Sequence, residues 1–177
     1  MTRTSERSAS RTWLTQAGRI ASFALRCDLV GMSMSAWSRL EAERAFSVAT
    51  RARRRAALLC RLRHRGCGCG RLAVFDGATL RRTAAQAGGG IRDIPLDAIR
   101  GTLEPNRAAQ FDPDFRPDSR ARERWERIWL AEQRGAALPP ISVVQLGDDY
   151  AIRDGHHRVS VARARGACTI SAIVDLQ

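Results

Sequence analysis

The chain has 177 residues, of which 30 are Lys or Arg and 18 are Asp or Glu, and its formal net charge is +12 at pH 7. This length allows one domain with an extension, or two very small domains. No apolar run approaches the length of a membrane span, and the polar first residues do not form a secretory signal. We therefore expect a cytoplasmic protein without a membrane partner, whose oligomeric state the sequence does not indicate.

The positive charge is concentrated in the N-terminal half of the chain. Residues 1–90 contain 17 Arg and 5 acidic residues, whereas residues 91–177 contain 13 of each. A basic block of this kind attracts nucleic acid or another anionic partner through its charge, without reading a sequence. The chain contains no Lys, so the codon bias of a GC-rich genome is an alternative explanation for the same block.

Residues 1–31 are rich in Ser, Thr and Arg and are interpreted as a disordered extension. Met32 and Met34 then open a segment that is more typical of a protein start. Residues 32–90 are predicted to be an Arg-rich helical segment followed by a linker. From Ala36 to about Arg63 the chain has no Pro or Gly and is rich in helix formers, which predicts one long helix. Its apolar stripe is patchy, so we expect it to dock loosely through Trp37, Leu40, Phe46, Leu58 and Leu59.

The five cysteines do not indicate a disulfide framework, because their number is odd and their spacing irregular. Cys60, His64, Cys67 and Cys69 form a group of potential zinc ligands. The Cys-x-Cys spacing is too tight for a zinc knuckle and no second pair follows, so we predict no metal site. Cys168 is expected to be a buried apolar residue.

Residues 91–177 alternate between strand and helix patterns and predict a small α+β domain. Residues 72–75 precede it and are interpreted as a short strand or a docking segment, and residues 84–90 are interpreted as a linker. We expect a loop over residues 101–117, followed by a helix that Asp118 or Ser119 caps and that runs to Arg134, where Gly135 stops it. Four strands are expected at residues 94–99, 141–146, 150–153 and 169–174, and a second helix runs from His156 to Gly166.

Gly155 stands where the strand at 150–153 turns into the helix that begins at His156. Such a junction presents unpaired backbone N–H groups with the positive end of the helix dipole behind them. His156, His157 and Arg158 place further donors in the first turn, so the junction is predicted to bind an anion, and a nucleotide phosphate is the anion that we expect. In the alternative, Asp154 caps the helix and the histidines simply pack. A metal site is disfavoured because adjacent His side chains point in different directions.

The loop around Phe111 and Phe115 contains Asp112 and Asp114, which resemble a pair of carboxylates for acid–base chemistry. We favour a structural interpretation, in which the Phe side chains anchor the loop and the Asp side chains bond to nearby backbone. Trp125 and Trp129, at helical spacing, are predicted to be core residues.

The order of these elements, together with the motif Asp154-Gly155-His156-His157-Arg158, resembles the ParB/sulfiredoxin superfamily over residues 91–177. Further points of resemblance are residues 94–99, Pro105-Asn106-Arg107, Gly135, residues 138–141 and Tyr150. The resemblance implies a ParB/sulfiredoxin-like small mixed sheet with packed helices, here preceded by the Arg-rich helical segment. ParB proteins carry Gly-Glu-Arg-Arg at this turn and bind CTP, and Gly155 and Arg158 match the ends of that run. Sulfiredoxins carry a catalytic Cys where this chain has His156, so their chemistry is not expected.

The resemblance implies a nucleotide-phosphate-binding domain, DNA-associated or regulatory, with CTP or ATP as ligand and without its own helix-turn-helix reader. Gly155, His156, His157 and Arg158 would bind the phosphate, and Arg107 and Arg116 are candidates for a second phosphate contact. The alternative is a small nucleotide-dependent enzyme, a phosphotransferase or nuclease. A serine-kinase branch of the superfamily has an Asp-Gly-His-x-Arg turn, and such activity needs an acid, with Glu104 and Asp154 as candidates, and Mg²⁺.

Overall fold

The computed structural model describes residues 34–63, 70–76 and 90–175. The predicted extension at 1–31 lies outside the described residues, as do His64, Cys67, Cys69 and almost all of the predicted linker at 84–90. Among the described helices, none combines the length and the apolar character needed to cross a membrane.

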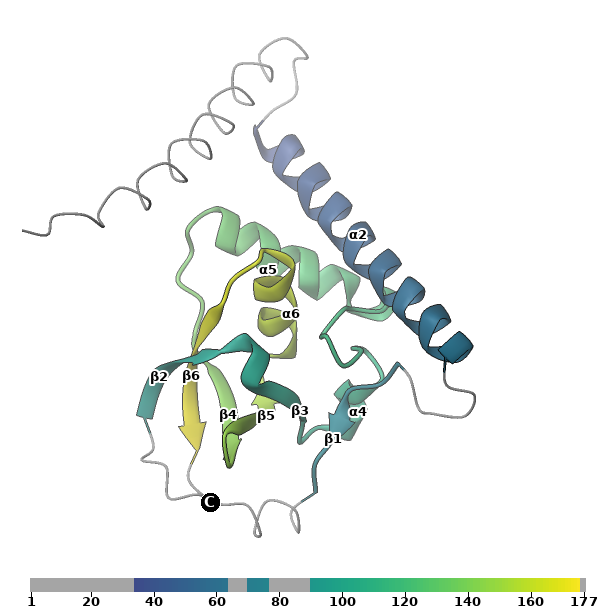
Figure 1. Cartoon of the computed structure of the whole chain (residues 1–177). Coiled ribbons are helices and arrows are strands. Elements are labelled where there is room, and N and C mark those ends of the chain that lie inside the picture. Colours follow the sequence, from purple (N-terminus) through teal and green to yellow (C-terminus); the bar gives the residue numbers. More distant parts are fainter. Residues whose placement is uncertain (1–33, 64–69, 77–89, 176–177) are drawn as a thin grey trace, which may run out of the picture. The chain divides into compact units, whose positions relative to one another are not determined.

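Six strands form one mixed sheet in the order β1-β3-β5-β4-β6-β2 (Figure 1). The neighbours β1–β3, β3–β5 and β4–β6 are parallel, whereas β4–β5 and β2–β6 are antiparallel. This mixed sheet with packed helices confirms the predicted α+β class. The strands are β1 (Ala73–Val74), β2 (Gly90–Pro95), β3 (Ile99–Thr102), β4 (Ile141–Leu146), β5 (Asp149–Asp154) and β6 (Thr169–Asp175).

The single strand predicted over residues 94–99 is wrong. Strand β2 ends at Pro95, the 3-10 turn η1 (Leu96–Ala98) follows, and β3 begins at Ile99. Ile94, Leu96 and Ile99 are all buried, so the apolar spacing arises from two strand ends and the turn between them. The predicted loop at 101–117 contains the end of β3 and one helical turn, α4 (Pro105–Ala108), which Pro105 begins because its fixed φ suits a first helical position.

Within the described residues, three longer helices contribute further residues to the core. They are α2 (Met34–Arg63), α5 (Arg122–Gln133), which follows the 3-10 turn η2 (Ser119–Ala121), and α6 (His156–Ala164). The predicted cap is confirmed, because the Asp118 carboxylate accepts a hydrogen bond from the Arg120 N–H at the start of η2. Trp125 and Trp129 are buried as predicted, at 0% and 7% exposure.

Helix α2 packs on the domain through its N-terminal half. Phe46 meets the Trp125 ring edge-on with centroids 5.5 Å apart, and the small Ala42 is buried beside it. Three leucines that the sequence analysis assigned to the docked stripe are instead exposed, namely Leu40, Leu58 and Leu59. The buried Cys168 that the sequence predicted is also wrong, because Cys168 is exposed. It lies just beyond the end of α6, where its carbonyl oxygen accepts a hydrogen bond from the Leu96 N–H.

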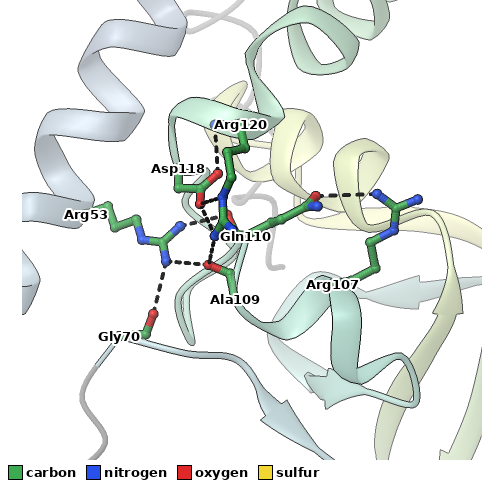
Figure 2. Close-up of polar contacts among 7 residues, drawn as sticks. All are labelled: Arg53, Gly70, Arg107, Ala109, Gln110, Asp118 and Arg120. Atoms are coloured by element: carbon green, nitrogen blue, oxygen red, sulfur yellow. Dashed lines mark hydrogen bonds and ion pairs between the residues drawn. The ribbon is translucent and has the colours of Figure 1, made fainter.

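Arg53 fastens α2 to the loop that follows α4 (Figure 2). Its guanidinium donates to the carbonyl oxygens of Gln110 at 2.6 Å, Ala109 at 3.0 Å and Gly70 at 3.1 Å. One side chain therefore satisfies carbonyl groups in two separate loops. Within the Arg-rich helix, this arginine has a structural role.

Replacing Arg53 by Met is expected to lower the free energy of unfolding by about 2 kcal/mol, because three charge-assisted hydrogen bonds are lost. Arg54→Met is the matched control, since Arg54 is exposed and is expected to change stability by less than about 0.5 kcal/mol. Urea denaturation of both variants measures the difference, and equal losses for the two would contradict this role for Arg53.

Candidate functional site

The junction between β5 and α6 has the backbone form that the sequence predicted. Gly155 is the N-terminal cap of α6, with φ +110° and ψ 14°. A Cβ atom at this position would lie 2.4 Å from Cγ2 of Ile141, so only glycine fits. Of the alternative interpretation, the packing of the histidines is confirmed, because both side chains are buried. The Asp154 cap is wrong, because the Asp154 carboxylate accepts a hydrogen bond from Arg158 and from no backbone N–H group in the described part of the chain. The first-turn N–H groups of α6 are therefore free of a side-chain cap.

A small recess of about 20 Å³ lies at this junction. That volume accommodates a group about the size of one water molecule or one phosphate oxygen. The recess brings Arg107 of α4 together with the predicted residues of the junction, and it adds Arg124 of α5, which the sequence analysis missed. It is lined by Arg107, Arg124, Ile128, Asp154, Gly155, His156, His157 and Arg158.

Arg158 is occupied by contacts within the domain. Its guanidinium donates to the carbonyl oxygens of Pro139 and Pro140 and, at 2.6 Å, to the Asp154 carboxylate. Its side chain is only 12% exposed. Arg158 therefore holds the segment before β4 against the start of α6, and it neutralises the carboxylate that lines the recess.

Arg107 and Arg124 have their charges available. Neither forms an ion pair with another described residue, and Arg107 makes only a long hydrogen bond, 3.4 Å, to the Gln110 side chain. Arg124 is exposed, and Arg107 is half-buried. The two arginines come from different helices and converge on the N-terminus of α6.

The side chains of His156 and His157 are packed into the domain, at 4% and 7% exposure. Nε2 of His156 lies 2.6 Å from Oγ1 of the buried Thr102, and Phe111 stacks on His156 and meets His157 edge-on. Burial is the main cause that lowers the pKa of each imidazole to about 4. The positive charge of Arg107 lowers both pKa values further, and that of Arg124 lowers the pKa of His157. Both histidines are therefore neutral at pH 7, and the positive charge at the recess comes from the arginines.

The structure does not bring Arg116 or Glu104 to the recess. Arg116 pairs with Asp112 at 3.4 Å and Asp114 at 3.0 Å, and it lines a separate pocket of about 530 Å³ beside α2. Glu104 precedes α4, where its carbonyl oxygen accepts the N–H groups of Arg107 and Ala108. The Asp112 carboxylate accepts the backbone N–H groups of Asp114 and Arg116, which confirms the structural interpretation of that loop.

Among the described residues, no group of three or more His, Cys, Asp or Glu is arranged to hold a metal ion. No protein-family model and no curated protein matches the chain. Among solved structures, the chain is similar to the crystal structure of sulfiredoxin from Arabidopsis thaliana, with 22% sequence identity and a TM-score of 0.34. The similarity covers 50% of this chain and 86% of that chain.

Proposed function

We propose that this α+β domain binds the phosphate group of a nucleotide at the N-terminus of α6. One observation carries the proposal: Arg107 and Arg124 converge on the first turn of α6, a nine-residue helix whose N-terminus has no side-chain cap. Neither arginine forms an ion pair with an acidic residue in the described part of the chain. Backbone N–H groups and the helix dipole favour an anion at this point, and two guanidinium groups supply full positive charge.

The size of the recess favours recognition of a phosphate group over enclosure of a whole nucleotide. About 20 Å³ accommodates one phosphate oxygen, so the remainder of the ligand would lie outside, along Arg107 and Arg124. The imidazoles of His156 and His157 are neutral, so they contribute no positive charge to binding of the anion. The N–H groups of His156 and His157 are the contacts that we propose, together with the two arginines.

Binding is favoured over catalysis at this site. Asp154 is the carboxylate among the lining residues, and its Oδ2 accepts a 2.6 Å hydrogen bond from Arg158. Because the Arg158 guanidinium already occupies this carboxylate, Asp154 is not positioned to accept a proton from an attacking group. We therefore propose a nucleotide-binding module, for which CTP and ATP are the ligands to test.

Calorimetric titration of the protein with CTP, ATP, ADP and tripolyphosphate tests this function. Arg107→Gln and Arg124→Gln are each expected to weaken binding about tenfold, because each removes one charge-assisted contact. Arg127→Gln is the matched control, since Arg127 lies on α5 but pairs with the exposed Glu123, away from the recess. The site would be refuted if the protein bound none of these four compounds, or if all three variants bound them with the same affinity.

A further inference from the structure

Three leucines near the C-terminal end of α2 are exposed to solvent. Leu58, Leu59 and Leu62 are 59%, 52% and 81% exposed, and together we call them the leucine patch. Leu62 lies four residues after Leu58 and three after Leu59, so both neighbour it on the helix surface and the three form one apolar surface. The opposite side of the helix carries Arg53, which faces the domain (Figure 2).

Arginines surround the leucine patch. From Arg44 to the end of α2 there are seven Arg and no acidic residue. Arg51, Arg54, Arg55 and Arg61 are exposed, and none pairs with an acid within the described part of the chain. Arg51 and Arg55 are spaced to share the side of the helix that carries Leu58 and Leu62. This surface therefore combines apolar area with an uncompensated positive charge.

The presence of both exposed leucines and exposed arginines on one surface distinguishes between three classes of partner. Nucleic acid phosphates would pair with the arginines, but they would gain little from three exposed leucines. A second copy of this helix would cover the leucines, but it would bring two strongly positive surfaces together. An anionic bilayer satisfies both features, because its phosphates lie within about 5–10 Å of the acyl boundary into which apolar side chains insert. Arginine side chains are long enough to reach those phosphates while leucine side chains enter the boundary.

We propose that the leucine patch and the arginines around it dock the protein on the surface of an anionic lipid bilayer. The contact is peripheral and does not involve a spanning helix. It goes beyond the expectation from the sequence, which predicted an anionic partner for the basic block but no membrane partner, and which placed Leu58 and Leu59 on the docked stripe of the helix. The proposal does not depend on the phosphate recess, whose arginines belong to α4 and α5.

Sedimentation of the full chain with lipid vesicles tests the proposal. Vesicles that contain phosphatidylglycerol are expected to bind the protein at least about tenfold more strongly than pure phosphatidylcholine vesicles, because each arginine near an anionic surface contributes separately. High salt should weaken this binding, since the arginines are exposed and their attraction is screened.

Two variants separate the charged part of the surface from the apolar part. Leu58→Ser with Leu62→Ser, and Arg51→Gln with Arg55→Gln, are each expected to lower binding to the anionic vesicles roughly tenfold. Ile91→Ser is the control, because Ile91 is 69% exposed on β2, away from the leucine patch, and replacing it should leave binding to the anionic vesicles unchanged. All five side chains are exposed, so the folded state should be kept in each case, and urea denaturation verifies this.

Three results would overturn the proposal. The first is equal binding to neutral and anionic vesicles. The second is tighter binding to duplex DNA than to anionic vesicles, together with unchanged vesicle binding by the variant Leu58→Ser with Leu62→Ser. That result would assign the surface to nucleic acid. The third is a concentration-dependent dimer that the serine variant abolishes, which would assign the leucine patch to a second copy of the chain.

Discussion

Replacing Gly155 by Ala is expected to lower the free energy of unfolding by about 3–5 kcal/mol, because two costs add. The first cost is conformational, since φ of +110° lies where residues with a Cβ atom are strained. The second cost is steric, since the new Cβ would lie 2.4 Å from Cγ2 and 2.7 Å from Cβ of Ile141. Ile141 is fully buried at the start of β4 and has little room to move.

Gly166→Ala is the matched control for this prediction. Gly166 follows α6 with φ of +75°, but no heavy atom lies within 4 Å of the position its Cβ would take. The control therefore carries a conformational cost alone, about 1 kcal/mol. Urea denaturation of both variants measures the difference. If the two lost stability equally, the close approach of Ile141 to the turn at Gly155 would be refuted.

The stability of the protein is expected to fall steeply between pH 6.5 and pH 4. In the folded state the pKa of His156 and that of His157 are lowered to about 4, mainly by burial, from an ordinary value of 6.5. Over this range the unfolded chain binds protons that the folded protein excludes, so stability present above pH 6.5 is lost as the pH falls. The loss is about 3 kcal/mol for each histidine, since one pKa unit corresponds to about 1.4 kcal/mol.

Two carboxyl groups act in the opposite direction. Burial raises the pKa of Asp112 and of Glu132, so the folded protein takes up these protons before the unfolded chain does. Their contribution is confined to the acidic end of the range, where carboxyl groups titrate, so the histidines should dominate above about pH 5. The slope in that interval therefore reports on the two imidazoles.

Urea denaturation at a series of pH values measures this dependence. The variant His156→Gln with His157→Gln keeps polar groups at both positions but does not titrate. It is expected to be less stable at pH 7, because the stacking on Phe111 is lost, and to show a much flatter profile from pH 6.5 to pH 5. A variant with the same slope as the original protein would show that other groups carry the acid sensitivity.

Local sequence signals were sufficient for the elements whose backbone is determined by nearby residues. The turn at Gly155, the cap at Asp118 and the end of α5 before Gly135 follow from glycine or side-chain caps that can be identified in the sequence. The helix at 34–63 follows from a long run without Pro or Gly. Each of these depends on contacts within a few residues, which explains why the sequence was informative there.

The errors concern features that depend on distant contacts. Residues 94–99 have the apolar alternation of a strand, but the turn at Leu96 is held by a hydrogen bond to Cys168. Leu58 and Leu59 fit a helical stripe, but α2 meets the domain through Ala42 and Phe46, which face Trp125. The sequence contains no signal for which part of a long helix will find a partner.

The candidate site was predicted in part for the same reason. Gly155 and its neighbours are adjacent in the sequence, and Arg107 was identified through the resemblance of Pro105-Asn106-Arg107 to the superfamily. Arg124 was missed because it is one of several arginines on α5, and only the packing of α5 against α6 brings it to the recess. The engagement of Arg158 with Pro139, Pro140 and Asp154 likewise depends on how the segment before β4 is folded.

Amide chemical shifts recorded during a titration with tripolyphosphate test the central claim most directly. If the uncapped turn of α6 receives the phosphate, the backbone N–H signals of His156 and His157 should shift most, while those at the C-terminal end of α6 stay in place. Unchanged signals for these two residues, or shifts confined to the arginines of α2, would show that the anion binds elsewhere.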